Sequence, residues 1–480
     1  MTATAELSPA PSVPAEASAP HWSPLELIGP LVVLVLGVLL LRPGYALWFD
    51  ELFTAEVARL PLGEILTAIV HGTGTTSYLD GVPPSYNAPY YLFVHFWASL
   101  SGLGGDTSLR LLSLLATASG LALVTRAVTR LSGRAVGVLA GTVLACSPLV
   151  LEQAVEARSY GLAVLATGGA ALGLVRWLQH PPRGLVLFGL AGAGMGLAHW
   201  YAVTVLAAFV VAALVLRGRR VVPVAVIAAL ATLPTFGFVA LAALNGTGAR
   251  NAEHLHDTGG LLAGLAVEAW SARSTVLLGV VGGLALVGAV RAARDVRAVA
   301  LAWLLVPLVL LTLAEFVRPV YLPRYLLAGL LVLAVLAAAG AFALPRPARA
   351  PVAVLLVGLS LLASSPLVDR VPRERGDEVV AWLVEVQEPG EPVVAADQRS
   401  AMALDHYIRD LAPELRADLI LPPDDAPPDA DRVWLVRRLF YGEPEPTDDD
   451  EILREAGLRM VDDQYFWAGK TDLIVQLWER

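Results

Sequence analysis

The sequence predicts an α-helical, multi-pass membrane protein of about eleven transmembrane helices, with a small α/β domain at its carboxyl end. The 480-residue chain is 56% hydrophobic and only 16% charged, with a mean hydropathy of +0.63. Soluble domains average about 45–50% apolar and about 25% charged residues. The apolar residues form runs of roughly 17–22, long enough to cross about 30 Å of hydrocarbon. Arginines cluster in alternate connections between those runs.

The segments follow one another in a clear order. An Ala-, Pro- and Ser-rich tail, residues 1–23, has too few apolar residues to form a core and is expected to be disordered. The membrane region is expected over 24–368. Its first helix, about 25–41, should remain as an anchor, because the tail lacks the basic region and cleavage pattern of a removed signal peptide. The later runs cover about 109–130, 135–151, 160–177, 185–199, 201–216, 222–243, 275–290, 299–317, 325–344 and 352–368.

Arginine placement predicts the orientation. Five short connections, each after every second run, hold these residues: Arg126, Arg130 and Arg134; Arg176 and Arg183; Arg217, Arg219 and Arg220; Arg291, Arg294 and Arg297; Arg346 and Arg349. Positive charge in short loops marks the cytoplasmic side of a membrane. The amino terminus is therefore expected in the cytoplasm. The composition, with Lys470 as the only lysine, is typical of high-GC bacterial genomes, so the predicted location is a bacterial plasma membrane.

Residues 369–480 differ in character from the rest. They hold 27 Asp and Glu against 13 Lys and Arg, and by the alternation of spans they lie outside the membrane. DEVVAWLVEV reads as an amphipathic helix, and PVVAAD, DRVWLV and LIVQLW read as strands. About 110 residues suffice for a small domain. We therefore expect an acidic, extracytoplasmic α/β domain.

The first outer connection, about 42–108, is too long to be a turn. In it Asp50 and Glu51 follow Trp48 and Phe49, just beyond the first helix. A carboxylate pair at a membrane boundary can supply a general base in a partly desolvated site. The alternative is that both acids only stabilise the amino end of a helix over 53–60 through its dipole.

The second outer connection reads SPLVLEQAVEARSYGLAV. Glu152 and Glu156 are predicted to share a helix face at a spacing of four, with Arg158 and Tyr160 close by. Of these residues, Glu156, Arg158 and Tyr160 are candidates for substrate binding.

Arginines also occur on the outer side, where positive charge is scarce. Arg318 and Arg324 lie in EFVRPVYLPRYLL at the membrane boundary. Each could reach lipid headgroups or pair with a neighbouring Glu. Several such arginines on one face instead indicate a bound anion, and a phosphate matches guanidinium geometry.

Histidines give a weaker signal. His199, in LAHWYAV, is either an interfacial histidine beside an aromatic belt or a catalytic group. His254, His256 and Asp257 lie close together but match no zinc signature, so no metal or other cofactor is expected and a divalent cation has no sequence support. No phosphate-cradling glycine loop and no basic nucleic-acid stripe occurs, so neither nucleotide chemistry nor a nucleic-acid partner is expected.

Four segments together resemble a known family. They are WFDELFTAEVARL, LRLLSLLATASGL, VEARSYGL and LPRYLL, and over about 25–368 they are similar in order and topology to the GT-C glycosyltransferases of the protein O-mannosyltransferase and aminoarabinose-transferase type, in their bacterial form. The resemblance implies a membrane enzyme that moves a sugar, such as mannose or another hexose or a pentose, from a polyprenyl-phosphate carrier. The acceptor would be a lipid, a glycan or a protein at the outer face among membrane lipids.

The resemblance also assigns residues. Asp50 matches the catalytic base, with Glu51 beside it. Arg324 and Tyr325 match a late Arg-Tyr pair that contacts the carrier phosphate. The second-loop motif is matched by Arg158 and Tyr160, beside Glu156.

One motif departs from the family pattern. The family often has an acid and His-Pro-Pro before a Tyr-Tyr pair, whereas this chain has Asn87, Ala88 and Pro89 before Tyr90 and Tyr91. A second catalytic carboxylate and the acceptor type are therefore left open.

Two other functions fit the same residues. A transporter or flippase of a lipid-linked sugar could use the outer arginines, and a scaffold could bind a partner through the acidic domain. Transporters often show internal repeats and broken helices at the midplane of the membrane. This sequence shows no such repeat and its ionisable residues gather at one face, which favours an enzyme.

Overall fold

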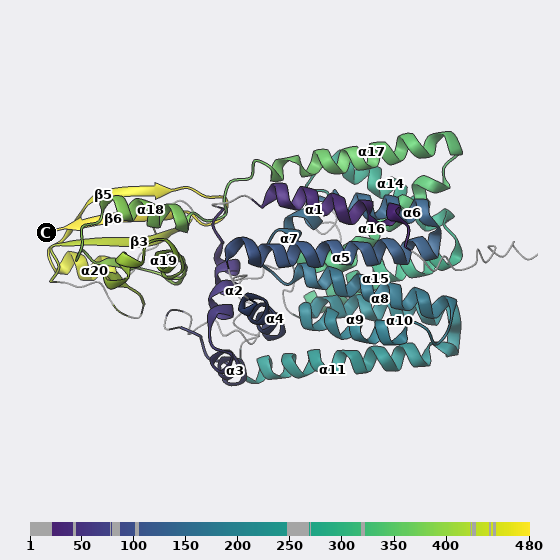
Figure 1. Cartoon of the computed structure of the whole chain (residues 1–480), viewed down its shortest axis with the longest axis horizontal. Helices are drawn as coiled ribbons and strands as arrows, with labels where there is room; N and C mark the ends of the chain where they lie inside the picture. The colour runs from purple at the N-terminus through teal and green to yellow at the C-terminus, as the bar shows by residue number, and fades with distance from the viewer. Residues whose placement is uncertain are drawn as a thin grey trace, which may run out of the picture.

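The computed structural model describes residues 22–41, 45–76, 78, 87–100, 105–246, 268, 270–317, 322–422, 424, 429–440, 443–444 and 448–480. These residues form a bundle of long helices, a layer of short helices across one end of it, and an α/β domain beyond that layer (Figure 1). Most of the tail predicted over 1–23 lies outside the described residues.

A helix is present in each of the eleven predicted ranges. The bundle helices are α1 (Ile28–Leu40), α5 (Asp106–Ser132), α6 (Arg134–Ala145), α7 (Pro148–Ala154), α8 (Tyr160–Gln179), α9 (Leu185–Ala198), α10 (Val203–Arg217), α11 (Val222–Leu244), α14 (Thr275–Arg291), α15 (Arg294–Glu315), α16 (Leu327–Ala343) and α17 (Arg346–Ser364). By length and apolar composition, six segments in the described ranges can cross a membrane, one of them joining α10 and α11, or seven with the bent pair α6–α7. The multi-pass architecture is confirmed, while the number eleven stays a prediction.

The third predicted span is not one straight helix. It bends by 64° between α6 and α7, where Pro148 begins a new helix. Helix α7 then ends at Ala154, so Glu156 lies in the turn before α8. The prediction that Glu152 and Glu156 share one helix face is therefore wrong, because the helical spacing does not continue past Ala154.

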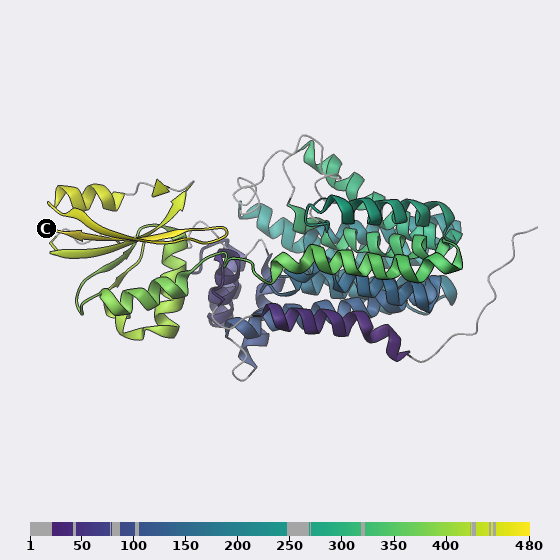
Figure 2. The ribbon, with the colours of Figure 1, turned by 90° about the horizontal axis from the view of Figure 1, so that it is seen from above.

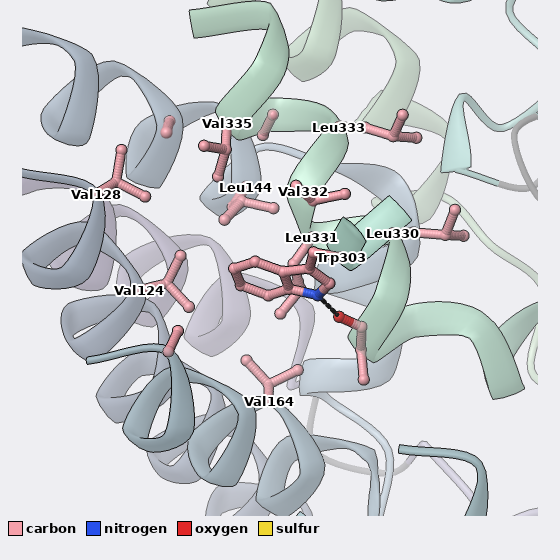
Figure 3. Packing of buried hydrophobic residues seen from close by; sticks show 14 of the residues in the cluster. Val124, Val128, Leu144, Val164, Trp303, Leu330, Leu331, Val332, Leu333 and Val335 are labelled. Atoms are coloured by element: carbon pink, nitrogen blue, oxygen red, sulfur yellow. Dashed lines mark hydrogen bonds between the residues drawn. The ribbon is translucent and has the colours of Figure 1, made fainter. Parts of the chain in front are cut away.

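The centre of the bundle is α16, whose residues are buried from Leu327 to Ala341. Trp303 of α15 packs among aliphatic side chains of α5, α8 and α16 (Figure 3). Its indole Nε1 donates a 2.9 Å hydrogen bond to the carbonyl oxygen of Ala328. This contact fixes the start of α16 just after the 3₁₀ helix η6 (Pro323–Leu326), which carries Arg324.

The carboxyl-terminal domain contains a mixed sheet between two layers of helices (Figure 2). Its strands are β1 (Val393–Ala395), β2 (Leu419–Ile420), β3 (Arg432–Phe440), β4 (Glu443–Pro444), β5 (Arg459–Phe466) and β6 (Leu473–Glu479), in the order β2-β1-β3-β6-β5 with β4 on β3. Strand β1 is parallel to β2 and β3, whereas β6 is antiparallel to β3 and β5.

Side chains alternate between the two faces of this sheet, as the pleat requires. Val393 faces the core formed with α18 (Gly376–Val386) and α19 (Gln398–Leu411), while Val394 faces the core beside α20 (Asp448–Glu455). The predicted helix and three strands are present here. Helices α19 and α20 and strand β5 were not predicted.

Three short helices separate the bundle from this domain: α2 (Phe49–Arg59), α3 (Leu62–His71) and α4 (Ala88–Ser99) (Figure 1). Helix α19 packs on α2, and the main-chain N–H of Leu47 donates a 2.6 Å hydrogen bond to the hydroxyl of Tyr407. The arginine-rich connections lie at the opposite end of the bundle (Figure 1). The two ends therefore differ in charge and in covering.

Candidate active site

Asp50 lies in the first turn of α2, at the end of the bundle that the short helices cover. An Nη2–H of Arg324 donates to its carboxylate at 3.2 Å, and Nη2 of Arg158 lies 3.8 Å from the same oxygen. Nη1 of Arg158 also donates to the main-chain oxygen of Asp50 at 3.1 Å. The Asp50 side chain keeps 22% of its surface exposed. The structure thus joins three predicted residues from three separate connections.

The charge state of Asp50 follows from these neighbours. Burial by itself raises the pKa of a carboxyl, but the Arg158 and Arg324 cations, with Lys470 behind them, outweigh it and hold the pKa of Asp50 below its usual value. Asp50 is therefore a carboxylate at neutral pH.

Glu51 has different surroundings. It is fully buried, and Arg110 of α5 donates to both of its oxygens, at 2.9 Å from Nε and 2.6 Å from Nη2. The main-chain N–H of Ala157 adds a third hydrogen bond at 2.7 Å. Burial tends to raise the pKa of Glu51, but Arg110 and this N–H lower it overall. Glu51 holds three segments together and is enclosed by its partners.

Arg110 was not predicted as a site residue. It lies in LRLLSLLATASGL, near the end of α5 that is predicted to be on the outer side, where arginine is expected to be scarce. The same argument that singled out Arg324 would have found it.

Glu156 shares a cation with Glu152. Nη2 of Arg373 lies 2.6 Å from an oxygen of Glu152 and 2.7 Å from one of Glu156. Burial, helped by the neighbouring Glu152 and opposed by Arg373, raises the pKa of Glu156 to about 7. The two glutamates predicted together do meet, although through an arginine that was not predicted.

Aromatic rings from three connections surround His199. Its ring centroid lies 5.1 Å from that of Tyr160 at the start of α8 and 5.1 Å from that of Tyr325 in η6. Tyr201, which was not singled out, stacks on Tyr325 at 4.8 Å. Helix α9 ends just before His199, and the backbone of His199 is extended between α9 and α10. The rings meet at this break between the two helices. This aromatic cluster adjoins Arg324, the residue before Tyr325.

The remaining predictions are not joined to Asp50. Asn87 is buried at the start of α4, and in the described ranges no hydrogen bond or ion pair links it to Asp50. Arg318, His254, His256 and Asp257 lie outside the described residues. Within the ranges that are described, no three His, Cys, Asp or Glu side chains are grouped so that they could hold a metal ion.

Comparison with known proteins identifies the fold. No protein-family model and no curated protein sequence matches the chain. ArnT from Cupriavidus metallidurans superposes with a TM-score of 0.57 in the apo state and 0.54 when bound to undecaprenyl phosphate, at 13% and 14% identity, over 94% of this chain and 97% of that one. The archaeal oligosaccharyltransferase AglB from Archaeoglobus fulgidus, in complex with an inhibitory peptide and a dolichol-phosphate, superposes with a TM-score of 0.50 at 13% identity, over 83% of this chain and 64% of that one. The chain therefore shares its fold with ArnT and AglB, in agreement with the resemblance that its motifs carry.

Proposed function

We propose that the chain is a membrane glycosyltransferase that moves a sugar from a polyprenyl-phosphate carrier to an acceptor hydroxyl, with inversion and with Asp50 as the general base. The observation that carries this proposal is a partly exposed carboxylate between Arg158 and Arg324 in a bundle with the GT-C fold. The undecaprenyl phosphate bound to ArnT and the dolichol-phosphate bound to AglB support a lipid carrier.

The charges at Asp50 suit an anionic ligand. Two arginines approach the carboxylate of Asp50, whereas Glu51 forms its ion pair with the buried Arg110. Guanidinium groups bind phosphate oxygens through paired N–H donors, and in a partly desolvated site such pairs are stronger than in water. Two positive charges face the single negative charge of Asp50, so an anionic phosphate can bind there.

The reaction follows as a single displacement. The acceptor oxygen attacks the anomeric carbon while the bond from that carbon to the phosphate oxygen breaks. The acceptor proton passes to the carboxylate of Asp50, and the bonding electron pair leaves with the polyprenyl phosphate. Arg158 and Arg324 stabilise the charge that develops on this leaving group, which therefore needs no protonation. No cofactor takes part in this scheme.

Carrier binding would also strengthen the base. Arg158 and Arg324 lower the pKa of Asp50 in the structure. A phosphate that binds the same arginines offsets their charge, so the pKa of Asp50 rises and its carboxylate accepts a proton more readily. Base strength and donor binding are coupled in this way.

The orientation in the membrane is part of the proposal. Short arginine-rich connections at one end of the bundle favour a cytoplasmic side there, with the amino terminus. Asp50 and the sheet domain then lie outside, in a bacterial plasma membrane. Exposed apolar side chains on the bundle, such as Val354, Leu362 and Leu233, suit contact with lipid.

A transfer assay tests the proposal. The purified chain is incubated with labelled polyprenyl-phosphate sugars and with lipid, glycan and peptide acceptors. We expect Asp50→Asn to lower the transfer rate by about 10²–10⁴-fold, the usual worth of a general base. Asp295→Asn, the same change at an exposed position at the arginine-rich end, is the control and should keep the full rate.

Two results would overturn parts of the proposal. An unchanged rate in correctly folded Asp50→Asn would remove Asp50 from the role of base. If no donor is used, while labelled carrier crosses the membrane of reconstituted vesicles, the chain is a transporter.

A further inference from the structure

The loop between β5 and β6 reaches from the sheet domain to the candidate active site. The main-chain N–H of Gly469 donates to the oxygen of Pro372 at 2.7 Å, and those of Lys470 and Thr471 donate to the oxygen of Arg373 at 3.2 and 3.0 Å. Three consecutive hydrogen bonds therefore hold this loop against the segment that carries Arg373.

These bonds place Lys470 beside the residues that precede Asp50. Its ammonium nitrogen lies 3.5 Å from the centre of the Trp48 ring, and the guanidinium carbon of Arg373 lies 4.8 Å from the same centre. Trp48 is buried and comes two residues before Asp50. A cation over an indole face is attracted to it. Lys470 as a whole is exposed, while its ammonium group lies over the Trp48 ring.

The ion pairs within the protein show which positively charged side chains already have an acidic partner. Arg110 pairs with Glu51, Arg373 contacts two glutamates, and Arg399 lies 3.5 Å from Glu374. The Arg158, Arg324 and Lys470 cations all act on the carboxylate of Asp50, and Glu156, which Arg373 contacts, also acts on Arg324 and Lys470. A monoester phosphate carries about −1.5 to −2 at pH 7.

We infer that Lys470 is a further substrate-binding residue of the donor site, and that its ammonium group binds the phosphate of the polyprenyl carrier. This inference rests on the proposed function. The sheet domain would then complete the site. A compact ammonium on a flexible stem can follow the phosphate as charge builds up on it, whereas Arg324 presents a fixed fork of donors.

Binding of undecaprenyl phosphate to the full-length protein tests this directly. We expect Lys470→Ala to raise the Kd about tenfold, as for the loss of a hydrogen bond to a charged group. Lys470→Arg keeps the charge and should stay within about threefold of the wild type. Arg459→Ala removes one positive charge from an exposed position on the same hairpin and is the matched control, with an unchanged Kd.

Covalent labelling gives a second readout that does not depend on activity. Lys470 is the only lysine, so an amine-acylating reagent marks only Lys470 and the α-amino group. Partial burial of the ammonium, with Arg324 and Arg373 near it and Asp50 opposing, lowers the pKa of Lys470 to about 8, which aids labelling at mild pH. Undecaprenyl phosphate should slow the acylation of Lys470 and leave that of the α-amino group unchanged.

The results separate this inference from the proposed function. If Arg324→Ala weakens binding but Lys470→Ala does not, and the carrier gives Lys470 no protection, the inference is wrong and the proposed function stands. If the wild type binds no undecaprenyl phosphate and transfers no sugar, the proposed function fails and the inference fails with it.

Discussion

The three acids of helix α2 lie in two contrasting settings. Asp50 is partly exposed and faces more cations than it can balance, whereas Glu51 and Glu56 are buried and bound by partners of their own. Glu56 accepts a 2.8 Å hydrogen bond from Arg409 and lies 2.8 Å from Nδ1 of His406. All three residues belong to one short helix, so the helix itself does not explain the contrast.

The charges around Glu56 nearly balance. The acids there are Glu56, Asp106, Asp405 and Asp410, and the basic residues are Arg59, Arg409, Arg416 and His406. We call this set the Glu56 cluster, and it joins α2 and α5 to α19 of the sheet domain. A charge-balanced cluster stabilises a contact between domains, while an unbalanced one has charge left for a ligand.

Among the variants that test this contrast, Glu51→Ala is expected to lower the free energy of unfolding most. It leaves the guanidinium of Arg110 buried without its carboxylate, and breaking a buried pair in this way typically costs about 3–5 kcal/mol. Asp50→Ala removes an acid from a partly exposed, cation-rich site and should change the free energy of unfolding by no more than about 1 kcal/mol. Denaturant unfolding of both variants in detergent measures the difference.

Equal losses in the two variants would contradict the contrast. Glu51→Gln is the control, because its amide keeps the volume and some of the hydrogen bonds. The decrease in its free energy of unfolding should fall between the decreases of the two alanine variants.

A pH titration of the Glu56 cluster should give an intermediate effect. His406 is fully buried, with Asp106 3.1 Å from Nε2, Glu56 2.8 Å from Nδ1 and Asp410 4.0 Å away. Burial lowers the pKa of His406, but the bonds to Asp106 and Glu56 raise it overall. Each unit above the unfolded value of about 6.5 contributes about 1.4 kcal/mol.

The sign follows from that raised pKa. The stabilising contribution is complete below the unfolded pKa, about 6.5, and is lost as the pH rises through the higher folded pKa. We expect the melting temperature of the wild type to fall over this range relative to that of His406→Asn. Parallel curves for the two proteins would show that His406 is not charged in the cluster.

Much of the membrane region could be predicted because each residue there follows a local rule. Each of the eleven ranges predicted from runs of apolar residues contains a helix. The arginine counts distinguish one end of the bundle from the other. The scarcity of arginine on the predicted outer side singled out Arg324, and the family resemblance singled out Arg158; both lie close to Asp50. The helix ranges and the arginine counts need only composition and spacing.

The contacts with the sheet domain could not be predicted in this way. Arg373 and Lys470 reach Trp48 from positions more than 300 residues away in the chain, and no local pattern marks either of them. The turn after Ala154 was missed for a related reason, since a spacing of four suggests one helix face even where the helix has already ended. Long-range partners decide which acids are enclosed.

The smallest effect is expected where the Glu56 cluster meets solvent. Nη2 of Arg59 lies 2.6 Å from a carboxylate oxygen of Asp410, but their side chains keep 26% and 40% of their surface exposed. Exposed pairs contribute about 0.2–1 kcal/mol, less at high salt. Asp410→Asn should therefore lower the free energy of unfolding by about 0.5 kcal/mol or less at low salt and by nothing measurable at high salt. If Asp410→Asn lowers the free energy of unfolding as much as Glu51→Ala does at both salt concentrations, burial does not decide which acids of α2 are structural. The contrast with Asp50 then loses its basis.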